Sequence, residues 1–363
     1  MMIDGIGEGS GGGERMAAGL ARAVAQKGEE VTLCVTRGVS EEDAASMRGA
    51  GVRVLGLDRR SALHLGAWRP LLRMLREERF DVLHAHKFGS NVWGVLFGRL
   101  RRVPVVIAHE QTWSYRGNPP RKALDWLMGR FSSAFVAVSS LDRERMIAKE
   151  HIPADKIAMI PNAYVPRPVE PRDLRAELGL DADVPVVGTA AVLRPQKALE
   201  VLVDAFATVA DRHPGAHLVI GGDGERRGAL EEQAARLGLG SRTHFLGMRE
   251  DVPNLLQAFD VAAMSSDFEG TPLFAAECMA SGTPLVATRV GGLPDLVEDG
   301  VSGILVPPRD PSALAGAIDG LLADPALRAR IGEAARERSE LFSLPHTADR
   351  FISLYRSLLA EAG

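Results

Sequence analysis

Two carboxylates eight positions apart, Glu269 and Glu277, offer the clearest chemistry in this chain. A Thr271-Pro272 turn lies between them, and an apolar run that predicts a helix begins at Leu273. A helix N-terminus presents free backbone N–H groups and the positive end of the helix dipole, and both favour a bound phosphate. Carboxylates accept hydrogen bonds from sugar or ribose hydroxyls. The segment therefore predicts a site for a ligand that carries a phosphate and hydroxyls.

The wider segment, residues 266–300, resembles the Glu-x7-Glu signature of the retaining family 4 glycosyltransferases, which use nucleotide-sugar donors. Its Gly-Thr-Pro and Gly-Gly turns, at 282–284 and 291–292, match that signature in spacing. The resemblance implies transfer of a hexose from a UDP- or GDP-linked donor to an acceptor hydroxyl, with retention. It also implies that Glu269 holds the hydroxyls of the sugar and Glu277 holds the ribose. The residues expected around the donor phosphate are Gly270, Thr271, Pro272 and Leu273.

Two basic residues follow the strand predicted over residues 186–190. Arg194 and Lys197 can neutralise a diphosphate, Arg through a forked set of donors and Lys as a mobile point charge. They resemble the phosphate-clamping pair of the same family, although Val192 stands where the family often has Arg and Ala198 replaces a common Gly. We expect Arg194 and Lys197 to stabilise the charge of the departing diphosphate during catalysis.

Further donor contacts are expected from glycine turns and from one arginine. Residues 11–15, Gly-Gly-Gly-Glu-Arg, resemble the glycine-rich loop and helix start of the family, where the backbone approaches the donor phosphate. The resemblance places Gly12 and Gly13 at the donor. Gly222 lies in a turn after a predicted strand and is expected to line the nucleotide, and Arg249 is expected to border the base.

Three histidines, His84, His86 and His109, stand at the ends of neighbouring predicted strands. The carboxyl ends of parallel strands are where α/β sheets bind ligands. By resemblance, His86 and His109 are expected to touch the acceptor or the transferred sugar, with His109 as a catalytic group and Lys87 beside the acceptor. His84 is interpreted as a core histidine with a hydrogen-bond partner. A zinc site is not expected, because no Cys or Asp at ligand spacing completes the three histidines.

One more acidic motif, Asp181-Ala-Asp183, has the D-x-D form of metal sites in a different transferase fold. It lies beside a proline-rich stretch and not at the end of a strand, so we interpret it as a solvated linker. We therefore expect no metal ligand, no divalent-metal dependence and no cofactor other than the nucleotide-sugar co-substrate.

Strand-like apolar runs alternate with amphipathic helical patterns along most of the chain, which predicts parallel βαβ units in an α/β fold. The predicted strands are 31–36, 52–57, 82–85, 105–108, 134–138, 157–160, 186–190, 217–220, 243–245, 261–264, 285–287 and 304–306. The predicted helices include 15–26, 70–77 and 199–211. Only residues 1–4 precede the glycine-rich loop, so either the first strand is short or the start site is placed late.

Residues 161–171 contain four prolines and no hydrophobic period, which marks a linker. Two Rossmann-like, doubly wound domains joined by such a hinge resemble the GT-B architecture. The resemblance implies an acceptor-binding domain over residues 1–165 and a nucleotide-sugar-binding domain over residues 166–346. It also implies that a C-terminal helix, within residues 347–363, crosses back to the first domain.

The composition, 46% hydrophobic and 25% charged over 363 residues, is that of an ordinary globular protein with room for two cores. Cys34 and Cys278 lie in apolar stretches and are interpreted as buried thiols in a reducing compartment. No apolar run reaches the roughly 18 residues of a membrane span, and no signal-peptide pattern opens the chain. We expect a cytoplasmic protein, either free or bound peripherally to the inner face of the membrane.

Charge is distributed unevenly along the chain. Residues 1–165 carry 24 Lys and Arg against 18 Asp and Glu, whereas residues 166–363 carry 19 against 29. Between Arg59 and Lys122 there are 13 basic residues and four acidic ones. Nucleic acid is not expected as a partner, because no nucleic-acid-binding motif accompanies the basic residues.

Aromatic side chains border two of the basic segments. Arginines recur at helical spacing beside Trp68, and others follow Trp93 and Phe97. Basic faces edged by aromatic residues suit a membrane interface, where each cation near an anionic leaflet contributes about 1 kcal/mol. We therefore expect the first half to contact an anionic membrane or a lipid-linked acceptor. A solvated, Arg-rich surface is the alternative interpretation.

Two other functions remain open on the sequence alone. A sugar-nucleotide epimerase shares the two-domain fold and the donor site, but it needs acid and base groups over the sugar and no acceptor. A non-catalytic nucleotide-sugar-binding subunit needs only the donor site. The intact glutamate pair and basic clamp count against that subunit without excluding it.

Overall fold

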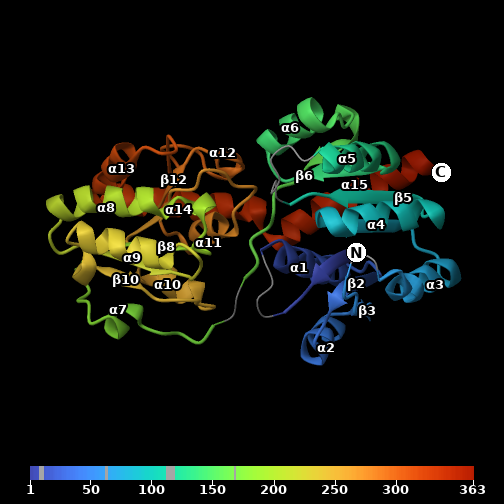
Figure 1. Ribbon diagram of the computed structural model, residues 1–363, viewed down its shortest axis with the longest axis horizontal. Helices are drawn as coiled ribbons and strands as arrows, with labels where there is room; N and C mark the ends of the chain where they lie inside the picture. The colour runs from blue at the N-terminus through green and yellow to red at the C-terminus, as the bar shows by residue number, and fades with distance from the viewer. Residues whose placement is uncertain (8–11, 62–63, 112–118, 167–168) are drawn as a thin grey trace. The chain divides into compact units, whose positions relative to one another are not determined.

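The computed structural model describes residues 1–7, 12–61, 64–111, 119–166 and 169–363 (Figure 1). The chain divides into two compact units. The first comprises Met1–Val165 together with Phe342–Gly363, and the second comprises Pro166–Leu341. Each unit is built around its own parallel sheet with helices packed on it. The predicted α/β fold with two Rossmann-like halves is thereby confirmed.

The described part of the first unit contains a seven-stranded parallel sheet in the order β3-β2-β1-β4-β5-β6-β7. The strands are β1 (Met2–Gly5), β2 (Val31–Gly38), β3 (Val52–Gly56), β4 (Val82–His86), β5 (Val105–His109), β6 (Ala134–Ala137) and β7 (Ile157–Met159). β1 is short, and Met2 pairs with Cys34 of β2 on one side and with Ala85 of β4 on the other. A short first strand, one of the two options that the sequence left open, is therefore present in the sheet.

Helices cover both faces of this sheet. They are α1 (Gly12–Gln26), α2 (Glu41–Gly49), α3 (Arg69–Glu77), α4 (Lys87–Leu100), α5 (Pro119–Phe131), α6 (Ser140–Glu150) and α15 (Leu344–Ala362). Successive residues of a strand point to opposite faces, so Ile107 and Ala108 belong to different cores. α1 and α15 pack on the Ile107 face through Leu20 and Phe351. α3, α4, α5 and α6 pack on the other face, where Trp68 is fully buried.

The second unit has a six-stranded parallel sheet in the order β10-β9-β8-β11-β12-β13. The strands are β8 (Val186–Ala190), β9 (His217–Gly221), β10 (Thr243–Phe245), β11 (Val261–Met264), β12 (Leu285–Thr288) and β13 (Ile304–Val306). Its helices are α7 (Leu174–Glu177), α8 (Leu199–Arg212), α9 (Arg227–Arg236), α10 (Val252–Ala258), α11 (Leu273–Ser281), α12 (Leu293–Leu296), α13 (Pro311–Ala323) and α14 (Pro325–Ser339). The helix predicted over residues 199–211 is α8, and its Leu202, Phe206 and Val209 are buried in the core.

The chain returns to the first unit earlier than the sequence suggested. The Tyr164 N–H donates to the Phe342 carbonyl oxygen (2.7 Å), and the Ser343 hydroxyl accepts from the His346 N–H at the start of α15. The division therefore falls at Phe342 and not at residue 347. Figure 1 draws α15, in red, among the elements of the first unit.

β4 and β5 end one residue later than predicted, so His86 and His109 are the last residues of their strands. The two are paired in register. This pairing brings together three histidines at the carboxyl edge of the first sheet. Within the described ranges, no helix combines the length and the hydropathy needed to cross a bilayer.

Candidate active site

Two loops at the carboxyl edge of the second sheet position the basic residues that follow β8. The Leu193 N–H donates to the Asp223 carbonyl oxygen (2.9 Å), and the Arg226 N–H donates to the Leu193 carbonyl oxygen (3.0 Å). Gly222 adopts a φ of +132°, and a Cβ there would overlap the Ala191 carbonyl oxygen. Only glycine fits such an approach of two backbones. Gly222 therefore lets the loops meet, and its contact with a nucleotide stays a prediction.

Lys197 and Glu269 form the centre of this site. The Lys197 Nζ lies 2.6 Å from Glu269 Oε1, although the two residues are 72 positions apart. The Ser266 hydroxyl donates to the same carboxylate oxygen at 2.6 Å. The Glu269 side chain is only 6% exposed, whereas Lys197 keeps 23% of its side chain exposed. A cation and a carboxylate that were predicted from separate motifs are thus in direct contact, and only the cation reaches the surface.

Backbone and side-chain hydrogen bonds hold these two loops together. The Asp267 N–H donates to the Gln196 carbonyl oxygen (2.9 Å), and the Gln196 side-chain amide donates to the Phe268 carbonyl oxygen (3.0 Å). The Ser265 hydroxyl donates to the Lys197 carbonyl oxygen at 3.0 Å. The charged pair therefore rests on a braced scaffold, as a preorganised site requires.

The double-glycine turn packs against the backbone of Glu269. Gly291 has a φ of +56°, and a Cβ there would overlap the Glu269 carbonyl oxygen. The next residue, Gly292, donates its N–H to the Gly270 carbonyl oxygen at 2.7 Å. The spacing seen in the sequence thus has a physical cause, because this turn sets the position of the Glu269 loop.

The first turn of α11 follows directly after that loop. Pro272 is the N-cap residue, and it provides no side-chain cap for the N–H groups of the helix start at Leu273. Thr271 is buried before the cap, and Glu277 lies one turn into the helix with only 8% of its surface exposed. The first N–H groups of a helix lack partners within the helix, so the start of α11 can accept an anion, and its contact with the donor phosphate stays a prediction.

The two predicted arginines differ in their surroundings. Arg194 is exposed at the start of the short turn that carries Lys197. Arg249 instead donates to both oxygens of Glu177 and both oxygens of Asp251, at 2.8 to 3.3 Å. These carboxylates raise the pKa of Arg249 further above its usual range. Arg249 therefore joins Glu177 of α7 to Asp251 before α10, and these contacts do not support the predicted place beside the base.

In the first unit, the start of α1 lies close to the start of α4. Gly12 begins α1, and a Cβ on Gly13 would overlap the side-chain oxygen of Gln111. Lys87, the first residue of α4, pairs with Glu14 through its Nζ. Gly13, Glu14, Lys87 and Gln111 are thus neighbours at the carboxyl edge of the sheet. Gly11, which belongs to the same predicted loop, lies outside the described residues.

Three histidine rings are stacked on the α1–α15 face of this sheet. His84, His86 and His109 are each at most 1% exposed. The ring centroids of His84 and His86 are 4.1 Å apart, and those of His86 and His109 are 4.8 Å apart. Burial lowers the pKa of His109 to about 3, and it lowers the pKa values of the other two well below their usual range. All three rings are therefore neutral at physiological pH.

A metal ion does not suit the rings in this arrangement. Their nearest nitrogens lie within 4.8 Å of one another. The His84 Nε2 lies 3.2 Å from the His109 Nδ1, at hydrogen-bond distance. A tetrahedral zinc ion needs its ligand nitrogens about 2.0–2.1 Å from one point. The stacked rings of His84 and His86 are inclined by only 28°, so their in-plane lone pairs do not converge on such a point.

Buried polar atoms without hydrogen-bond partners gather at this edge. Within the described ranges, these atoms are the Nε2 of His86, the Nε2 of His109, the Oε1 of Gln111 and the Oε2 of Glu14. A buried polar atom without a hydrogen bond costs about 1–3 kcal/mol, so several of them at one edge favour a bound ligand or water that completes the bonds. The sequence analysis missed Glu14 and Gln111. Their positions in the sequence could have indicated both, since Glu14 lies in the glycine-rich motif and Gln111 follows His109 by two residues.

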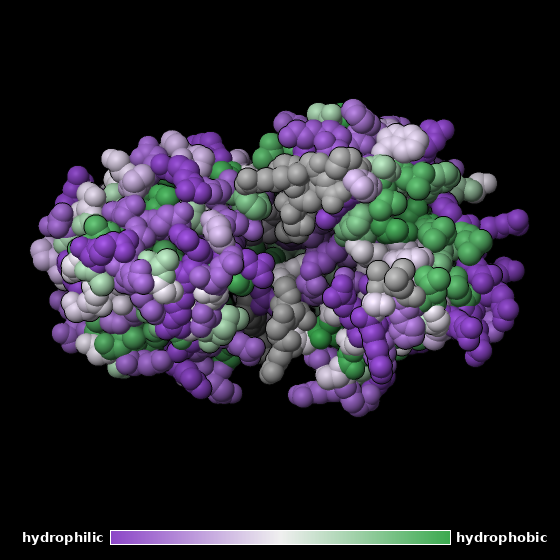
Figure 2. All heavy atoms as spheres, in the orientation of Figure 1, coloured by the Kyte–Doolittle hydropathy of each residue, from purple (hydrophilic) through white to green (hydrophobic). Residues whose placement is uncertain are grey.

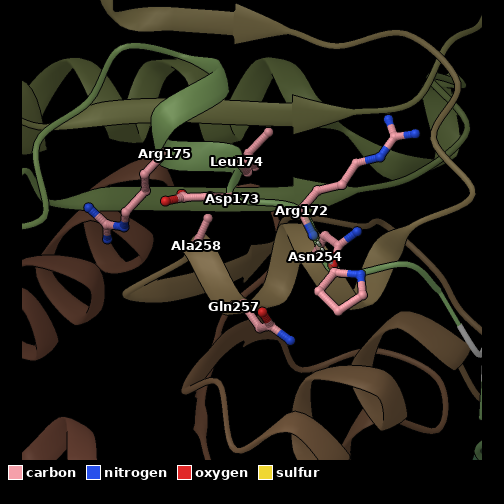
Figure 3. Close-up of a pocket in the computed structure, with 8 residues that line it drawn as sticks. Arg172, Asp173, Leu174, Arg175, Asn254, Gln257 and Ala258 are labelled. Carbon is pink, nitrogen blue, oxygen red and sulfur yellow. Dashed lines mark hydrogen bonds between the residues drawn. The ribbon is translucent and has the colours of Figure 1, made fainter.

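A separate hollow of about 340 Å³ lies between α10 and the segment before α7 (Figure 3). None of the predicted site residues lines it. Two of its polar side chains already have partners: Asn254 accepts from the Arg172 N–H and donates to the Glu170 carbonyl oxygen, and Asp173 caps α7. The hollow is not part of the predicted site.

The sequence matches two family profiles that together cover most of the chain. Residues 10–166 match "Glycosyltransferase Family 4", and residues 171–338 match "Glycosyl transferases group 1". The two matches meet at the proline-rich linker.

Curated relatives include enzymes with assigned activities. The D-inositol 3-phosphate glycosyltransferase of Saccharomonospora viridis is 38% identical over 205 residues, which cover 53% of this chain and 48% of that protein. The chain thus spans about half the length of this relative. The alpha-D-kanosaminyltransferase of Streptomyces kanamyceticus is 30% identical over 308 residues, covering 79% of this chain and 80% of that enzyme.

Solved structures share the fold. Anabaena HepE in complex with UDP superposes with a TM-score of 0.83 at 24% identity, covering 98% of this chain and 99% of HepE. The same protein in complex with UDP-glucose superposes with a TM-score of 0.80. At this level of identity, the likeness establishes the architecture of both units and leaves the ligand of this chain open.

Proposed function

The chain belongs to family 4 of the glycosyltransferases, which have the GT-B fold, and from this premise we propose that it transfers a sugar from a nucleotide-sugar donor to an acceptor hydroxyl with retention. The observation that carries the proposal is the contact of Lys197 with Glu269, braced by Ser266 and placed directly before the start of α11. One cation, one carboxylate and one helix N-terminus supply the three groups that a sugar diphosphate needs. UDP-linked donors are the first to test, since HepE was crystallised with UDP-glucose.

The proposed roles follow from charge and position. Lys197, Arg194 and the N–H groups at the start of α11 neutralise the diphosphate, whose charge grows as the bond from the sugar carbon to the phosphate oxygen breaks. Glu269 holds hydroxyls of the sugar, and Glu277 holds the ribose. The acceptor oxygen bonds to the same face of the sugar carbon, and its proton goes to the departing phosphate oxygen. No protein nucleophile is needed in this front-face route, so catalysis depends on positioning and charge.

In the unliganded protein, Lys197 neutralises Glu269. A donor diphosphate would attract the Lys197 Nζ, which is the more exposed partner, and would leave the Glu269 carboxylate free to accept hydroxyl donors. The same cations take the place of a metal at the diphosphate, so we propose a metal-independent reaction. EDTA should leave the rate unchanged, and restoration of a lost rate by magnesium or manganese would contradict this part of the proposal.

The function is tested by incubating the protein with UDP- and GDP-sugars, with and without acceptors. A cyclitol phosphate is the first soluble acceptor to try, given the inositol 3-phosphate glycosyltransferases among the relatives. We expect a glycoside with the donor's anomeric configuration, measured from proton couplings by NMR. Lys197→Ala should abolish the reaction, whereas the matched control Arg212→Ala, which breaks an exposed ion pair with Asp319, should not. A change of the sugar without acceptor would instead identify an epimerase, and binding without either reaction would identify a non-catalytic subunit.

A peripheral contact with an anionic membrane is the second part of the proposal. The membrane contact was expected from aromatic residues beside the arginines, but these do not form an exposed surface. Trp68 and Phe97 are buried, and Trp93 packs against both. Several exposed apolar residues of the first unit lie instead on α4 and α5, where green atoms gather in Figure 2. This α4–α5 face consists of Leu96, Leu100, Leu124, Leu127 and Phe131.

Exposed basic side chains lie on the same segments as the α4–α5 face. Arg99, Arg102, Lys122 and Arg130 are exposed on the same two helices or directly after α4. The Arg99 guanidinium also donates to the Phe131 carbonyl oxygen (2.5 Å) and so joins the C-terminal ends of the helices. Apolar side chains beside cations suit the interface of an anionic leaflet. Burial of the apolar groups among the lipids and attraction of the cations to anionic headgroups both favour binding.

Co-sedimentation with vesicles tests the membrane contact. We expect the protein to pellet with vesicles rich in phosphatidylglycerol and to remain in solution with phosphatidylcholine alone, and high salt should weaken binding. Leu100→Ser with Phe131→Ser should abolish binding, since these side chains are 63% and 50% exposed on the face. The matched pair Leu237→Ser with Met248→Ser removes exposed apolar side chains of the second unit and should leave binding intact. Recovery in the supernatant with both lipids would favour a soluble acceptor.

A further inference from the structure

A chain of hydrogen bonds leads from α15 to the unpartnered nitrogen of His109. The Tyr355 hydroxyl lies 2.7 Å from the His84 Nδ1, and the His84 Nε2 lies 3.2 Å from the His109 Nδ1. The remaining ring nitrogen, the His109 Nε2, is buried and has no partner within the described ranges. We propose that Tyr355 and His84 are positioning residues that fix His109 in the tautomer with its proton on Nε2, so that His109 presents an N–H donor to the substrate. The role of that donor rests on the proposed glycosyltransferase function.

The direction of the chain follows from the number of protons available. Burial raises the pKa of Tyr355 above its usual range, so the phenol keeps its proton. Its hydroxyl then donates to the His84 Nδ1. A neutral His84 must carry its single proton on Nε2, from which it donates to the His109 Nδ1. A neutral His109 in turn has its proton on Nε2.

The opposite direction is less stable. With the proton of His109 on Nδ1, His84 would accept on Nε2 and donate from Nδ1 to the phenolic oxygen. The Tyr355 hydroxyl hydrogen would then need another acceptor, and among the residues that the structure describes its hydroxyl bonds only to His84. The hydroxyl faces the buried His84 ring, and a donor left without an acceptor there costs about 1–3 kcal/mol, which is enough to select one tautomer.

The surroundings hold the chain in place. Asn91 accepts from the His109 N–H (3.1 Å) and donates to its carbonyl oxygen (3.2 Å), so both backbone groups of His109 are fixed by one side chain. The Phe351 ring lies 5.0 Å from the His84 ring and 5.6 Å from the His109 ring. α15 thus contributes Tyr355 for the hydrogen bond and Phe351 for the packing.

A fixed N–H on a neutral ring suits a polar acceptor on the substrate. A hydroxyl or phosphate oxygen can accept from it, and the ring neither loses nor gains a proton in the process. His86 is arranged alike: the Gln111 side-chain amide lies 3.1 Å from the His86 Nδ1 and donates to it, so the unpartnered His86 Nε2 also carries its proton. Two N–H donors therefore stand side by side at the carboxyl edge of the first sheet.

NMR of protein labelled with ¹⁵N-histidine reads the tautomer directly, without any assay of activity. We expect the wild type to show a protonated Nε2 and a bare Nδ1 for His109 across neutral pH. Tyr355→Phe removes only the hydroxyl, and we expect His109 to become a mixture of tautomers. We also expect kcat to fall by about tenfold, which corresponds to the loss of one hydrogen bond. Phe351→Leu is the control on the same helix: it should lower the melting temperature while leaving the tautomer unchanged.

The outcomes separate this inference from the proposed function. A proton on the Nδ1 of His109 in the wild type would overturn the inference even if the protein transfers sugar. A wild-type tautomer and wild-type kcat in Tyr355→Phe would overturn it as well, and so would equal effects of Tyr355→Phe and Phe351→Leu on the tautomer. If the protein transfers no sugar, the tautomer measurement still decides whether Tyr355 and His84 set the proton of His109.

Discussion

The Glu269 carboxylate is buried, and its negative charge is balanced inside the protein. A carboxylate in a loop is ordinarily exposed, yet Glu269 lies almost wholly inside the protein with its charge balanced by Lys197 and a hydroxyl. Removal of such a group leaves a cation without its counter-ion. Because the Lys197 side chain is still partly exposed, its ammonium can turn to water, and the loss of stability is limited.

Glu269→Gln should therefore separate activity from folding. The amide keeps the size of the side chain but loses the charge, and we expect kcat/KM to fall by roughly 100-fold or more, as for other preorganised polar groups. The melting temperature should change by only a few degrees, since the loss is on the order of 1 kcal/mol. Glu277→Ala should instead weaken nucleotide binding, measured by calorimetry with UDP. Near-normal turnover of Glu269→Gln would show that the donor site is misplaced.

Glu110 is a second buried acid, next to His109 at the end of β5. Burial raises its pKa to about 8, and the nearby carboxylates Asp125 and Glu150 add to the rise, while Arg121 and Arg145 oppose it. In the unfolded chain the same group titrates at its ordinary value of 4.5. Between these values the folded state binds more protons than the unfolded state, so stability falls as the pH rises through this window.

Glu110→Gln tests whether stability falls as the pH rises because Glu110 loses its proton. The amide mimics the protonated acid and cannot ionise, so the variant should match the wild type near pH 5 and exceed its stability at pH 9. Urea unfolding at both pH values measures the difference. Glu144→Gln, an exposed acid on α6, is the control that should leave the pH dependence unchanged. Parallel curves for Glu110→Gln and the wild type would show that Glu110 is not protonated in the folded state.

At the scale of elements, turns and strand ends position the site. Lys197 follows β8, the Glu269 loop follows β11, and the turn at Gly291 follows β12. These strands are neighbours in the sheet, so the three loops meet at one edge. Backbone and side-chain hydrogen bonds join these loops, and the one from the Gly292 N–H to the Gly270 carbonyl oxygen depends on the close approach that Gly291 allows.

Gly291→Ala should distort the Glu269 loop. The new Cβ would meet the Glu269 carbonyl, in addition to the roughly 1–2 kcal/mol that a left-handed backbone costs a residue with a side chain. Gly300→Ala is the matched control, because its φ is +76° and no atom lies near its Cβ position. We expect the first variant to lose clearly more unfolding free energy than the second, and to lose activity. Equal losses, by urea unfolding, would show that the turn relaxes around the added methyl.

At the scale of the whole molecule, the two units differ in how the chain builds them. The second unit is one continuous segment, Pro166–Leu341, whereas the first needs Phe342–Gly363 to cover its sheet. α15 buries Phe351 and Ala348 in the core of that first unit. A fragment that ends at Val165 would expose this core, while the second unit has a core of its own.

The second unit should therefore fold alone. A fragment of residues 166–341 is expected to unfold cooperatively and to bind UDP, because Lys197, Glu269 and α11 all lie within it. Thermal shift against UDP measures this, since a ligand of the folded state raises apparent stability. Lys197→Ala in the same fragment should reduce the shift. A folded fragment without any shift would place a necessary part of the nucleotide site in the first unit.

The alternation of apolar strands with amphipathic helices determined the fold class, and the turn residues determined where the loops lie. Those signals are local: strand period, helix period and glycine at tight turns can be read within a few neighbouring residues. For this reason the ends of every predicted strand agree with the structure to within two residues, whereas β1 was left open. The glutamate and basic motifs are also local in the sequence, and their roles were inferred from their resemblance to a known family.

Contacts between distant residues were decided only by the tertiary structure. The pairing of Lys197 with Glu269, the burial of Trp68 and the bond from Tyr355 to His84 each join segments that the order of strands and the packing of helices bring together. No local pattern encodes them, because they depend on which parallel strands become neighbours and on which face each helix covers. Residue type indicated which groups could do chemistry, and packing determined which of them meet.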